Sequence, residues 1–167
     1  MDWPQGMTTD RTGSIWTANC GSDSLTVYPP DSDPSRARNI KVGVKQPFHL
    51  VDNGRALFVS GVESSSIAML DLSGRPIRTP ITGPHVDNPL GLATDVRGNV
   101  WIANSGVITM PCPPDRPPSG TGSFGSVSAL DPTGKTLVGP LRGGGITIPW
   151  GNHDRRRRQR LGGQLRR

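Results

Sequence analysis

The sequence of 167 residues has few aromatic residues, only two cysteines and no long hydrophobic run. Hydrophobic residues make up 32% of the chain and aromatic residues 5%, which is little for a protein with a large packed core. No stretch approaches the roughly 18 apolar residues of a membrane-spanning helix. No basic segment followed by an apolar one marks a signal peptide. Two cysteines are too few for a fold held mainly by disulfides.

Glycine and proline, in contrast, are plentiful, with 22 and 17 residues. This content is typical of low-complexity chains or of turn-rich all-β folds. Apolar residues do not recur at helical spacing over the length of a helix, so no helix is expected. The composition therefore favours many short strands joined by turns.

The formal net charge of +6 comes entirely from the end of the chain. Residues 152–167 hold seven of the 19 basic side chains and one acid, Asp154. The preceding 151 residues are left with twelve basic and twelve acidic groups and are neutral. A nucleic-acid interpretation of the charge therefore concerns only this tail.

An internal repeat organises the neutral part of the chain. Residues 4–19 align without a gap to residues 89–104, with identical Pro, Gly, Thr, Asp, Gly, Trp, Ala and Asn. A weaker copy at 47–60 is one residue shorter at its turn and has Phe58 in place of the tryptophan. A fourth copy begins at 149–151. Repeats of this kind predict an array of similar structural units.

The repeat period predicts four-stranded β-propeller blades. Successive prolines of the repeat are 43, 42 and 60 residues apart, and the last spacing falls to 41 without an insertion at 107–125. About 42 residues is the length of one blade. In the first and third copies, an Asp-x-x-Gly turn joins a first strand to the strand that carries the aromatic residue, and the second copy has the shorter Asp-x-Gly at this place. Further strands are expected at 24–28, 66–71 and 126–130, with weaker ones at 39–42, near Ile77 and at 136–138.

These blocks resemble the NHL-type propellers and the wider group of streptogramin lyase and gluconolactonase-like enzymes. The resemblance covers nearly all of residues 3–151 and implies an all-β partial propeller with blades starting near residues 4, 47, 89 and 149. The repeated residues are those that build blades, so they indicate the fold better than the activity. We expect Asp10, Asp52 and Asp95 to serve in turns, and Trp16 and Trp101 to pack between blades.

The arginine-rich tail interrupts the fourth copy. When the likely codons of residues 152–165 are read one nucleotide later, ten of the fourteen positions permit the residue found at 92–105. We therefore predict that residues 152–167 are a disordered product of a frame shift at Trp150–Gly151, which sequencing the gene would test. The alternatives are a genuine basic arm that binds phosphates non-specifically and a solvated, disordered tail.

Three blades and the start of a fourth do not complete a propeller ring of four to eight blades. The chain begins at a blade edge and stops inside another blade. We therefore expect it to be part of a longer propeller. Its blade edges would then present unpaired strands to other chains.

The candidates for chemistry are few, because the chain has one glutamate, Glu63, and only two histidines outside the tail, His49 and His85. Streptogramin lyase-like enzymes use His and Glu with a divalent metal, but no motif places those residues here. Glu63 is expected in an exposed loop, and His49 is expected to pack or cap at a strand start. His85 with Asp87 and Asn88 offers a cation site, against the simpler interpretation of a Gly/Pro/Asn/Asp loop. No catalytic, cofactor or metal residue is therefore assigned.

The two cysteines lie in different copies of the repeat. Cys20 ends a strand of the first copy, and Cys112 lies in the insertion of the third. Pairing with each other, pairing with cysteines elsewhere and free thiols all remain open. Their spacing does not match a metal site.

These observations favour a non-catalytic role, in which the intact parent is a scaffold that binds a protein or a small-molecule ligand. The alternative is a metal-dependent streptogramin-lyase-like or gluconolactonase-like parent, which would use Ca or Mg and of which this chain would be an inactive part. A basic-tailed nucleic-acid binder is the third alternative, and no specific nucleic-acid partner is expected. The resemblance implies an exported parent, extracellular or periplasmic.

Overall fold

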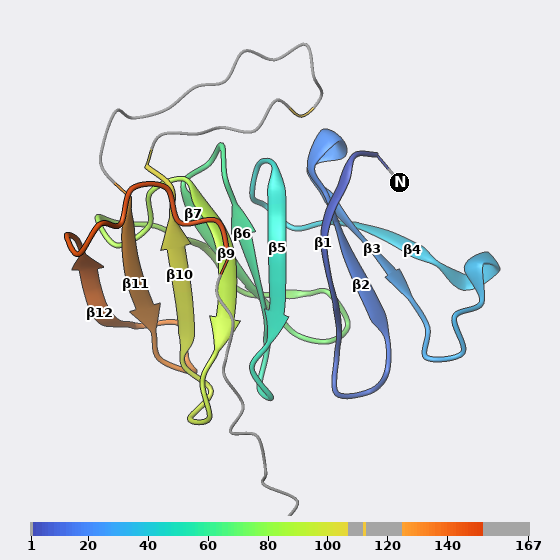
Figure 1. Ribbon diagram of the computed structural model, residues 1–167. Helices are drawn as coiled ribbons and strands as arrows, with labels where there is room; N and C mark the ends of the chain where they lie inside the picture. Colours follow the sequence, from blue (N-terminus) through green and yellow to red (C-terminus); the bar gives the residue numbers. More distant parts are fainter. Residues whose placement is uncertain (1, 107–111, 113–124, 152–167) are drawn as a thin grey trace, which may run out of the picture.

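Each complete copy of the repeat forms one four-stranded antiparallel sheet in the computed structural model, which describes residues 2–106, 112 and 125–151 (Figure 1). The first blade contains β1 (Pro4–Thr9), β2 (Ile15–Asn19), β3 (Ser24–Tyr28) and β4 (Arg38–Lys41). The second contains β5 (Pro47–Asp52), β6 (Leu57–Gly61), β7 (Ser66–Leu70) and β8 (Pro76–Ile81). The third contains β9 (Pro89–Thr94), β10 (Val100–Asn104), β11 (Ser126–Leu130) and β12 (Thr136–Leu141).

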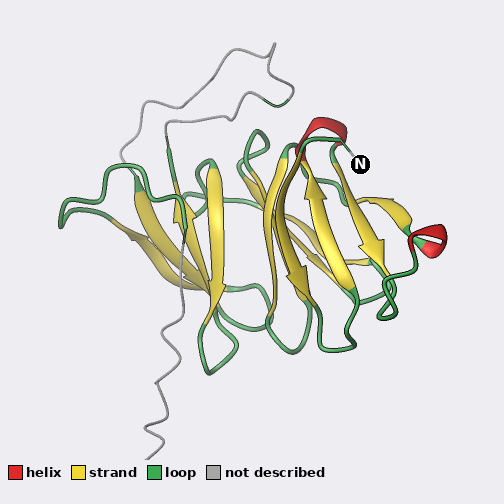
Figure 2. Ribbon diagram, turned by 45° about the vertical axis from the view of Figure 1, so that its right-hand side comes forward, coloured by secondary structure: helices red, strands yellow, loops and turns green. Residues whose placement is uncertain are grey.

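The strands follow one another in each sheet in the order of the sequence, as propeller blades require. Each blade begins at the proline of its repeat. The first strands line up from blade to blade, with β1 against β5 and β5 against β9, and the sheets stand face to face (Figure 2). The prediction of an all-β partial propeller is therefore confirmed.

The hydrophobic core lies in two layers between the blades, and the second sheet contributes side chains from both of its faces. Between the first and second blades, Trp16, Leu25 and Val27 pack with Leu50 and residues of β6 and β7. A second layer between the second and third blades joins Phe58, Met69 and Ile81 to residues of β9, β10 and β11. Adjacent residues of one strand point to opposite faces, so neighbours in the sequence serve different layers.

The aromatic position of the repeat is the same in all three blades. Trp16 lies opposite Thr8, Phe58 opposite Val51 and Trp101 opposite Ala93, each partner four residues after the blade's proline. Phe58 therefore replaces the tryptophan, as predicted. Trp16 is completely buried between blades, which confirms its packing role, whereas Trp101 is half-buried on the far side of the third blade.

The structural description leaves out parts of two predicted segments. The insertion at 107–125 is described only at Cys112 and Gly125, and the tail 152–167 lies outside the described residues, as does the prediction of a frame shift. At the start of the fourth copy, the Trp150 ring packs edge-on against Phe48 of β5, with 6.3 Å between ring centroids. None of the helices in the described part of the chain is long and apolar enough to span a membrane.

Candidate functional site at the mouth of the inner strands

The two ends of the sheets differ in their chemistry. The turn end comprises the hairpins that follow the first and third strands of each blade. The mouth end comprises the starts of β1, β5 and β9, the ends of β2, β6 and β10, and the loops between them. The two ends lie opposite each other because neighbouring strands are antiparallel.

Asp10 organises the first hairpin of the turn end. Its Oδ1 accepts hydrogen bonds from the Thr12 and Ser14 N–H groups at 2.8 and 3.0 Å, and its Oδ2 accepts one from Trp16 Nε1 at 2.8 Å. Burial would raise the pKa of the Asp10 carboxyl, but these hydrogen bonds outweigh it and lower the pKa. Asp95 and Trp101 repeat the arrangement with 3.2 Å between Oδ2 and Nε1.

In the second blade, the predicted Asp52 and its neighbour Asn53 share this turn role, since Asp52 Oδ1 accepts from the Gly54 N–H at 2.8 Å. Asn53 Oδ1 accepts from the Arg55 and Ala56 N–H groups, and Asn53 lies six residues after the blade's proline, like Asp10 and Asp95. Asp52 is also the last residue of β5. The turn of this copy is one residue shorter, so two neighbouring side chains divide its backbone N–H groups between them.

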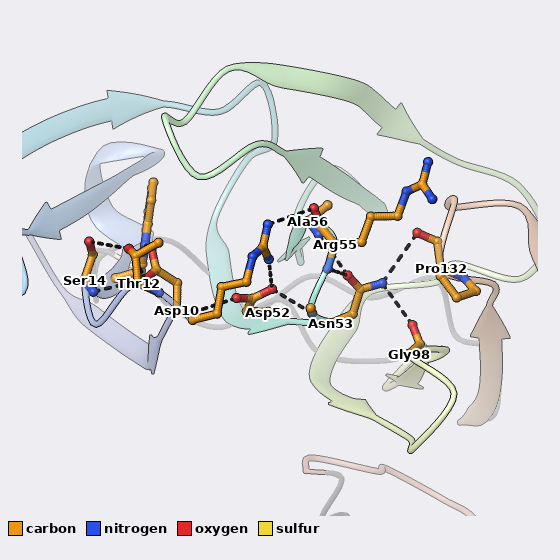
Figure 3. A network of polar contacts seen from close by, with 12 residues as sticks. Asp10, Thr12, Ser14, Asp52, Asn53, Arg55, Ala56, Gly98 and Pro132 are labelled. Atoms are coloured by element: carbon orange, nitrogen blue, oxygen red, sulfur yellow. Dashed lines mark hydrogen bonds and ion pairs between the residues drawn. The ribbon is translucent and has the colours of Figure 1, made fainter.

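Contacts between hairpins close the turn end (Figure 3). Asp52 accepts hydrogen bonds from Gly54 N–H and from the Arg11 guanidinium of the first blade, the latter at 2.9 Å. The Asn53 amide donates to the carbonyls of Gly98, at 2.9 Å, and Pro132, at 3.5 Å, in the third blade. The carboxylates of this end are therefore occupied in holding turns and joining blades.

The mouth end carries residues in a left-handed backbone conformation directly before each blade's proline. Trp3, Gln46 and Asn88 have φ values of 51°, 50° and 43°. Non-glycine residues with positive φ are uncommon, and proline disfavours helical conformations in the residue before it. Such strained positions cluster at binding sites, where the surrounding structure enforces them. The repetition in three blades therefore marks a candidate site.

Gln46 is completely buried at this end. Its N–H donates to Asp23 Oδ1 of the first blade at 2.8 Å, and its carbonyl accepts from Val62 N–H. Its side-chain Nε2 donates to the carbonyl of Cys112 at 3.2 Å, whereas its Oε1 has no hydrogen-bond partner. A buried acceptor without a donor costs about 1–3 kcal/mol, so this orientation is unfavourable on its own.

Asn88 repeats this situation one blade further along. It is 5% exposed, its N–H donates to Ser65 Oγ, and its Nδ2 donates to the Val62 carbonyl at 3.0 Å. Its Oδ1 is also without a partner. With Asn19 Oδ1 at the end of β2, the mouth end offers three buried amide oxygens without a partner in the described residues, two of them on residues directly before a blade's proline.

A disulfide between Cys20 and Cys112 lies beside Gln46 and joins the first blade to the insertion of the third. It spans 92 positions of sequence with 5.9 Å between the Cα atoms. Of the three alternatives, pairing of the two cysteines with each other is the one the structure shows. Cys112 therefore lies beside the first blade, although it belongs to the repeat of the third.

The structure assigns packing contacts to His49. Its Nδ1 accepts from the Leu92 N–H of β9 at 3.2 Å, and its own N–H donates to Ser60 Oγ. A Cβ at Gly6 of β1 would come within 2.9 Å of the His49 ring, so the glycine leaves room for the imidazole. The ring therefore bridges neighbouring inner strands, and Glu63 lies exposed in the loop after β6.

Within the predicted grouping of His85, Asp87 and Asn88, the side chains of His85 and Asn88 diverge and do not share one site. The His85 ring lies 3.2 Å from Thr136 Oγ1 at the start of β12, whereas the Asn88 amide reaches Val62. Burial and the nearby Arg78 lower the pKa of His85. Among the described residues, no three His, Cys, Asp or Glu side chains come close enough to hold a metal ion, so these residues do not fit the divalent metal of the lyases.

Sequence reasoning missed Gln46 as a site residue and Asn53 as a turn residue. The signal for Gln46 was its position before the repeated proline, which the repeat alignment left out. Its burial depends on Asp23, Val62 and Cys112, which come from all three blades.

Comparison with known proteins places this architecture among β-propellers. No family model and no curated protein matches the sequence. A chain of a nidogen–laminin complex superposes with a TM-score of 0.62 at 15% identity over 89% of this chain and 51% of its own. Virginiamycin B lyase from Staphylococcus aureus, solved with quinupristin, superposes with 0.65 at 15% identity over 89% and 44%.

A third similar structure is comparable in length to this chain. The computationally designed Ika4 protein superposes with a TM-score of 0.61 at 8% identity over 92% of this chain and 81% of its own. The chain thus spans about half or less of the two natural propellers. At these identities, the likeness shows the fold alone.

Proposed function

We propose that this partial β-propeller is an NHL-like binding module whose mouth end takes a protein or small-molecule ligand. The observation that carries the proposal is the pair of buried, unpartnered oxygens, Gln46 Oε1 and Asn88 Oδ1, at equivalent positions of neighbouring blades. Buried polar groups are normally satisfied, and the exceptions need an explanation. A bound ligand that donates to both oxygens supplies one.

The chemistry of the ligand follows from these two acceptors. Amide oxygens accept hydrogen bonds from N–H and O–H groups and carry no charge. A ligand with neighbouring donors, such as the backbone of an extended peptide, matches them better than an anion does. The turn end has no comparable feature in the described residues, since its carboxylates are already bonded.

Selection of displayed peptides on the purified chain tests this proposal. We expect enriched peptides to lose at least tenfold in affinity for a Gln46→Leu, Asn88→Leu double variant. Their affinity for an Asp131→Asn variant, which changes an exposed turn, should stay unchanged. Peptides that bind both variants as well as the natural sequence would place the ligand elsewhere and refute the proposal.

A lyase-like activity of the intact parent is the second candidate, favoured by the superposition on virginiamycin B lyase. Incubation of the chain with virginiamycin B, with and without Mg²⁺, tests it by mass spectrometry of the product. Metal-dependent turnover would support the enzymatic alternative. Absence of turnover would rule out lyase activity of this chain by itself.

A further inference from the structure

The hairpin between β5 and β6 contains the residue pair Asn53–Gly54. Asparagine is a chemically labile residue, because the backbone nitrogen of the next residue can attack its Cγ atom and close a succinimide ring. Glycine hinders this attack least, since it has no Cβ atom. Asn53 is the only asparagine of the sequence that glycine follows.

Gly54 leaves this turn open to rearrangement. It is exposed and has a φ of 84°, and a Cβ atom built on it would have no heavy atom within 4 Å. The backbone can therefore rotate at Gly54, and bring its nitrogen onto the side-chain carbon of Asn53, without displacing a neighbouring group.

The Asp52 carboxylate lies at the nitrogen that must lose its proton. Its Oδ1 accepts from the Gly54 N–H at 2.8 Å. The backbone N–H and the guanidinium of Arg11, both at 2.9 Å, hold the same carboxylate in place. A fixed carboxylate within hydrogen-bond reach of the proton meets the geometric requirement for a general base.

Two backbone N–H groups lie at the oxygen on which negative charge develops. Asn53 Oδ1 accepts from Arg55 N–H at 3.0 Å and from Ala56 N–H at 2.9 Å (Figure 3). Attack on Cγ turns this oxygen into an oxyanion. Preorganised donors at such an oxygen stabilise the transition state, as an oxyanion hole does.

The third blade holds the nitrogen that leaves. Asn53 Nδ2 donates to the carbonyl of Gly98 at 2.9 Å and to the carbonyl of Pro132 at 3.5 Å. These contacts fix the side-chain amide across the blade interface. The base, the oxyanion donors and the leaving group therefore surround one side chain.

We propose that Asn53–Gly54 is a self-modification site, at which Asp52 acts as the base. The bond from Gly54 N to Asn53 Cγ forms, and the Gly54 N–H proton passes to the Asp52 carboxylate. The Cγ–Nδ2 bond breaks, and Nδ2 takes the proton from Asp52 and leaves as ammonia. Water then opens the succinimide ring and leaves aspartate or isoaspartate at position 53.

The reaction loosens the contact between the second and third blades. A carboxylate at position 53 no longer donates to the carbonyls of Gly98 and Pro132, and its negative charge repels their oxygens. The modified chain should therefore unfold at a lower temperature than the unmodified chain.

Prolonged incubation of the purified 167-residue chain in neutral buffer, followed by peptide mass spectrometry, tests the proposal. We expect position 53 to react and Asn99 to stay intact, because the branched Cβ of the following Val100 hinders attack. Asp52→Ala should slow the reaction at least tenfold, as removal of a general base does.

Arg11→Ala is the matched control, because it breaks the ion pair with Asp52 and keeps the carboxylate at the Gly54 N–H. Its rate should not fall below that of the natural chain, and circular dichroism verifies that both variants fold. A rate as low as that of Asp52→Ala would show that loosening of the turn, and not loss of a base, slows the reaction, and would overturn the proposal.

The natural chain supplies a second test that needs no variant. The folded turn assembles the base and the oxyanion donors, so position 53 should react faster in the folded chain than in the same chain unfolded in urea. An equal or slower rate in the folded chain would show that the turn protects Asn53, and would overturn the proposal as well.

Discussion

The turn end and the mouth end belong to the same three sheets, but they treat their polar side chains in opposite ways. At the turn end, Asp10, Asn53 and Asp95 accept hydrogen bonds from backbone N–H groups of their own hairpins. At the mouth end lie all three buried side-chain oxygens without a partner in the described residues, those of Asn19, Gln46 and Asn88. The acceptors named at the turn end find hydrogen-bond donors within the chain, whereas these three oxygens at the mouth end do not.

This difference gives the two ends different roles: the turn end stabilises the fold, and the mouth end is the candidate binding site. Residues that satisfy their neighbours lower the free energy of the folded state, whereas buried unpartnered acceptors raise it. Functional sites are commonly less stable than the scaffold that supports them. Substitutions at the turn end should therefore reduce stability, and substitutions of the unpartnered oxygens should reduce binding.

Loss of the disulfide is expected to have the largest effect on stability. The Cys20→Ser, Cys112→Ser variant frees a loop that spans 92 positions, for which the chain-entropy model predicts a loss of about 4.6 kcal/mol in unfolding free energy. Guanidinium denaturation of variant and natural chain measures this loss. Equal unfolding midpoints would show that the bond contributes little to the mouth end, and the reduced natural chain is the control.

Removal of the Asp10 carboxylate is the next largest effect. Asp10→Ala leaves the buried Trp16 indole N–H and two backbone N–H groups without their acceptor, so we expect a loss of about 2–3 kcal/mol in unfolding free energy. Asp131→Ala removes the acceptor of an exposed turn and should cost less. A smaller loss at Asp10 than at Asp131 would contradict the importance assigned to the buried bond.

The link between Asp10 and Trp16 can be isolated by a double-mutant cycle. The second blade combines Asn53 with Phe58, which has no indole N–H to satisfy. Asp10→Asn should therefore cost about 1 kcal/mol less in a Trp16→Phe background than in the natural chain. Additive losses would show that the two side chains act independently.

Acid should lower the stability of the fold by a smaller amount and in two stages. Burial and Arg78 lower the pKa of His85, so the unfolded chain binds the proton first, and stability begins to fall as the pH drops below about 6.5. Hydrogen bonds lower the pKa of Asp10 despite its burial. Its contribution is complete above pH 3.8 and is lost as the pH falls through the lower folded value.

Thermal unfolding between pH 8 and pH 2 follows both stages. The His85→Gln variant should lose the first decline and keep the second. If the first decline in stability persists in this variant, another titratable group causes it. Stability that rises on acidification would contradict both pKa shifts.

The smallest effect on stability is expected at Gln46. Gln46→Leu removes the unpartnered Oε1 together with the hydrogen bond to the Cys112 carbonyl, so the change in unfolding free energy should stay within about 1 kcal/mol. Denaturation of this variant beside Asp10→Ala compares the two ends directly. A loss above about 2 kcal/mol would make Gln46 a structural residue like Asp10.

Much of the blade architecture was predictable because it repeats. The proline spacing and the Asp-x-x-Gly turns located β1, β2, β9 and β10, and the second hairpin signals located β7, β8, β11 and β12. Local hydrogen bonds within two to four residues explain this success, since Asp71 and Asp131 each bind the backbone of their own turns. In the second blade, where the turn is one residue shorter, Asp52 accepts from the Gly54 N–H and Asn53 accepts from the Arg55 and Ala56 N–H groups.

The candidate site was less predictable, because its residues depend on contacts between blades. Nothing in the residues around Gln46 shows that its side chain is buried, and nothing in the spacing of Cys20 and Cys112 decides their pairing. His85 and Asn88 are three residues apart, yet their side chains reach β12 and the loop after β6. Sequence proximity therefore suggested a common site that the backbone geometry separates.

By itself, the sequence determined the strands, the turns and the number of blades, because each rests on interactions within one repeat. The tertiary structure decided which amide oxygens are buried without a partner and which cysteines meet. These features depend on surfaces from different repeats that meet only when the sheets pack face to face. The residues of each repeat specify one blade. The packing of one blade on the next determines which buried polar groups are left without a hydrogen-bond partner.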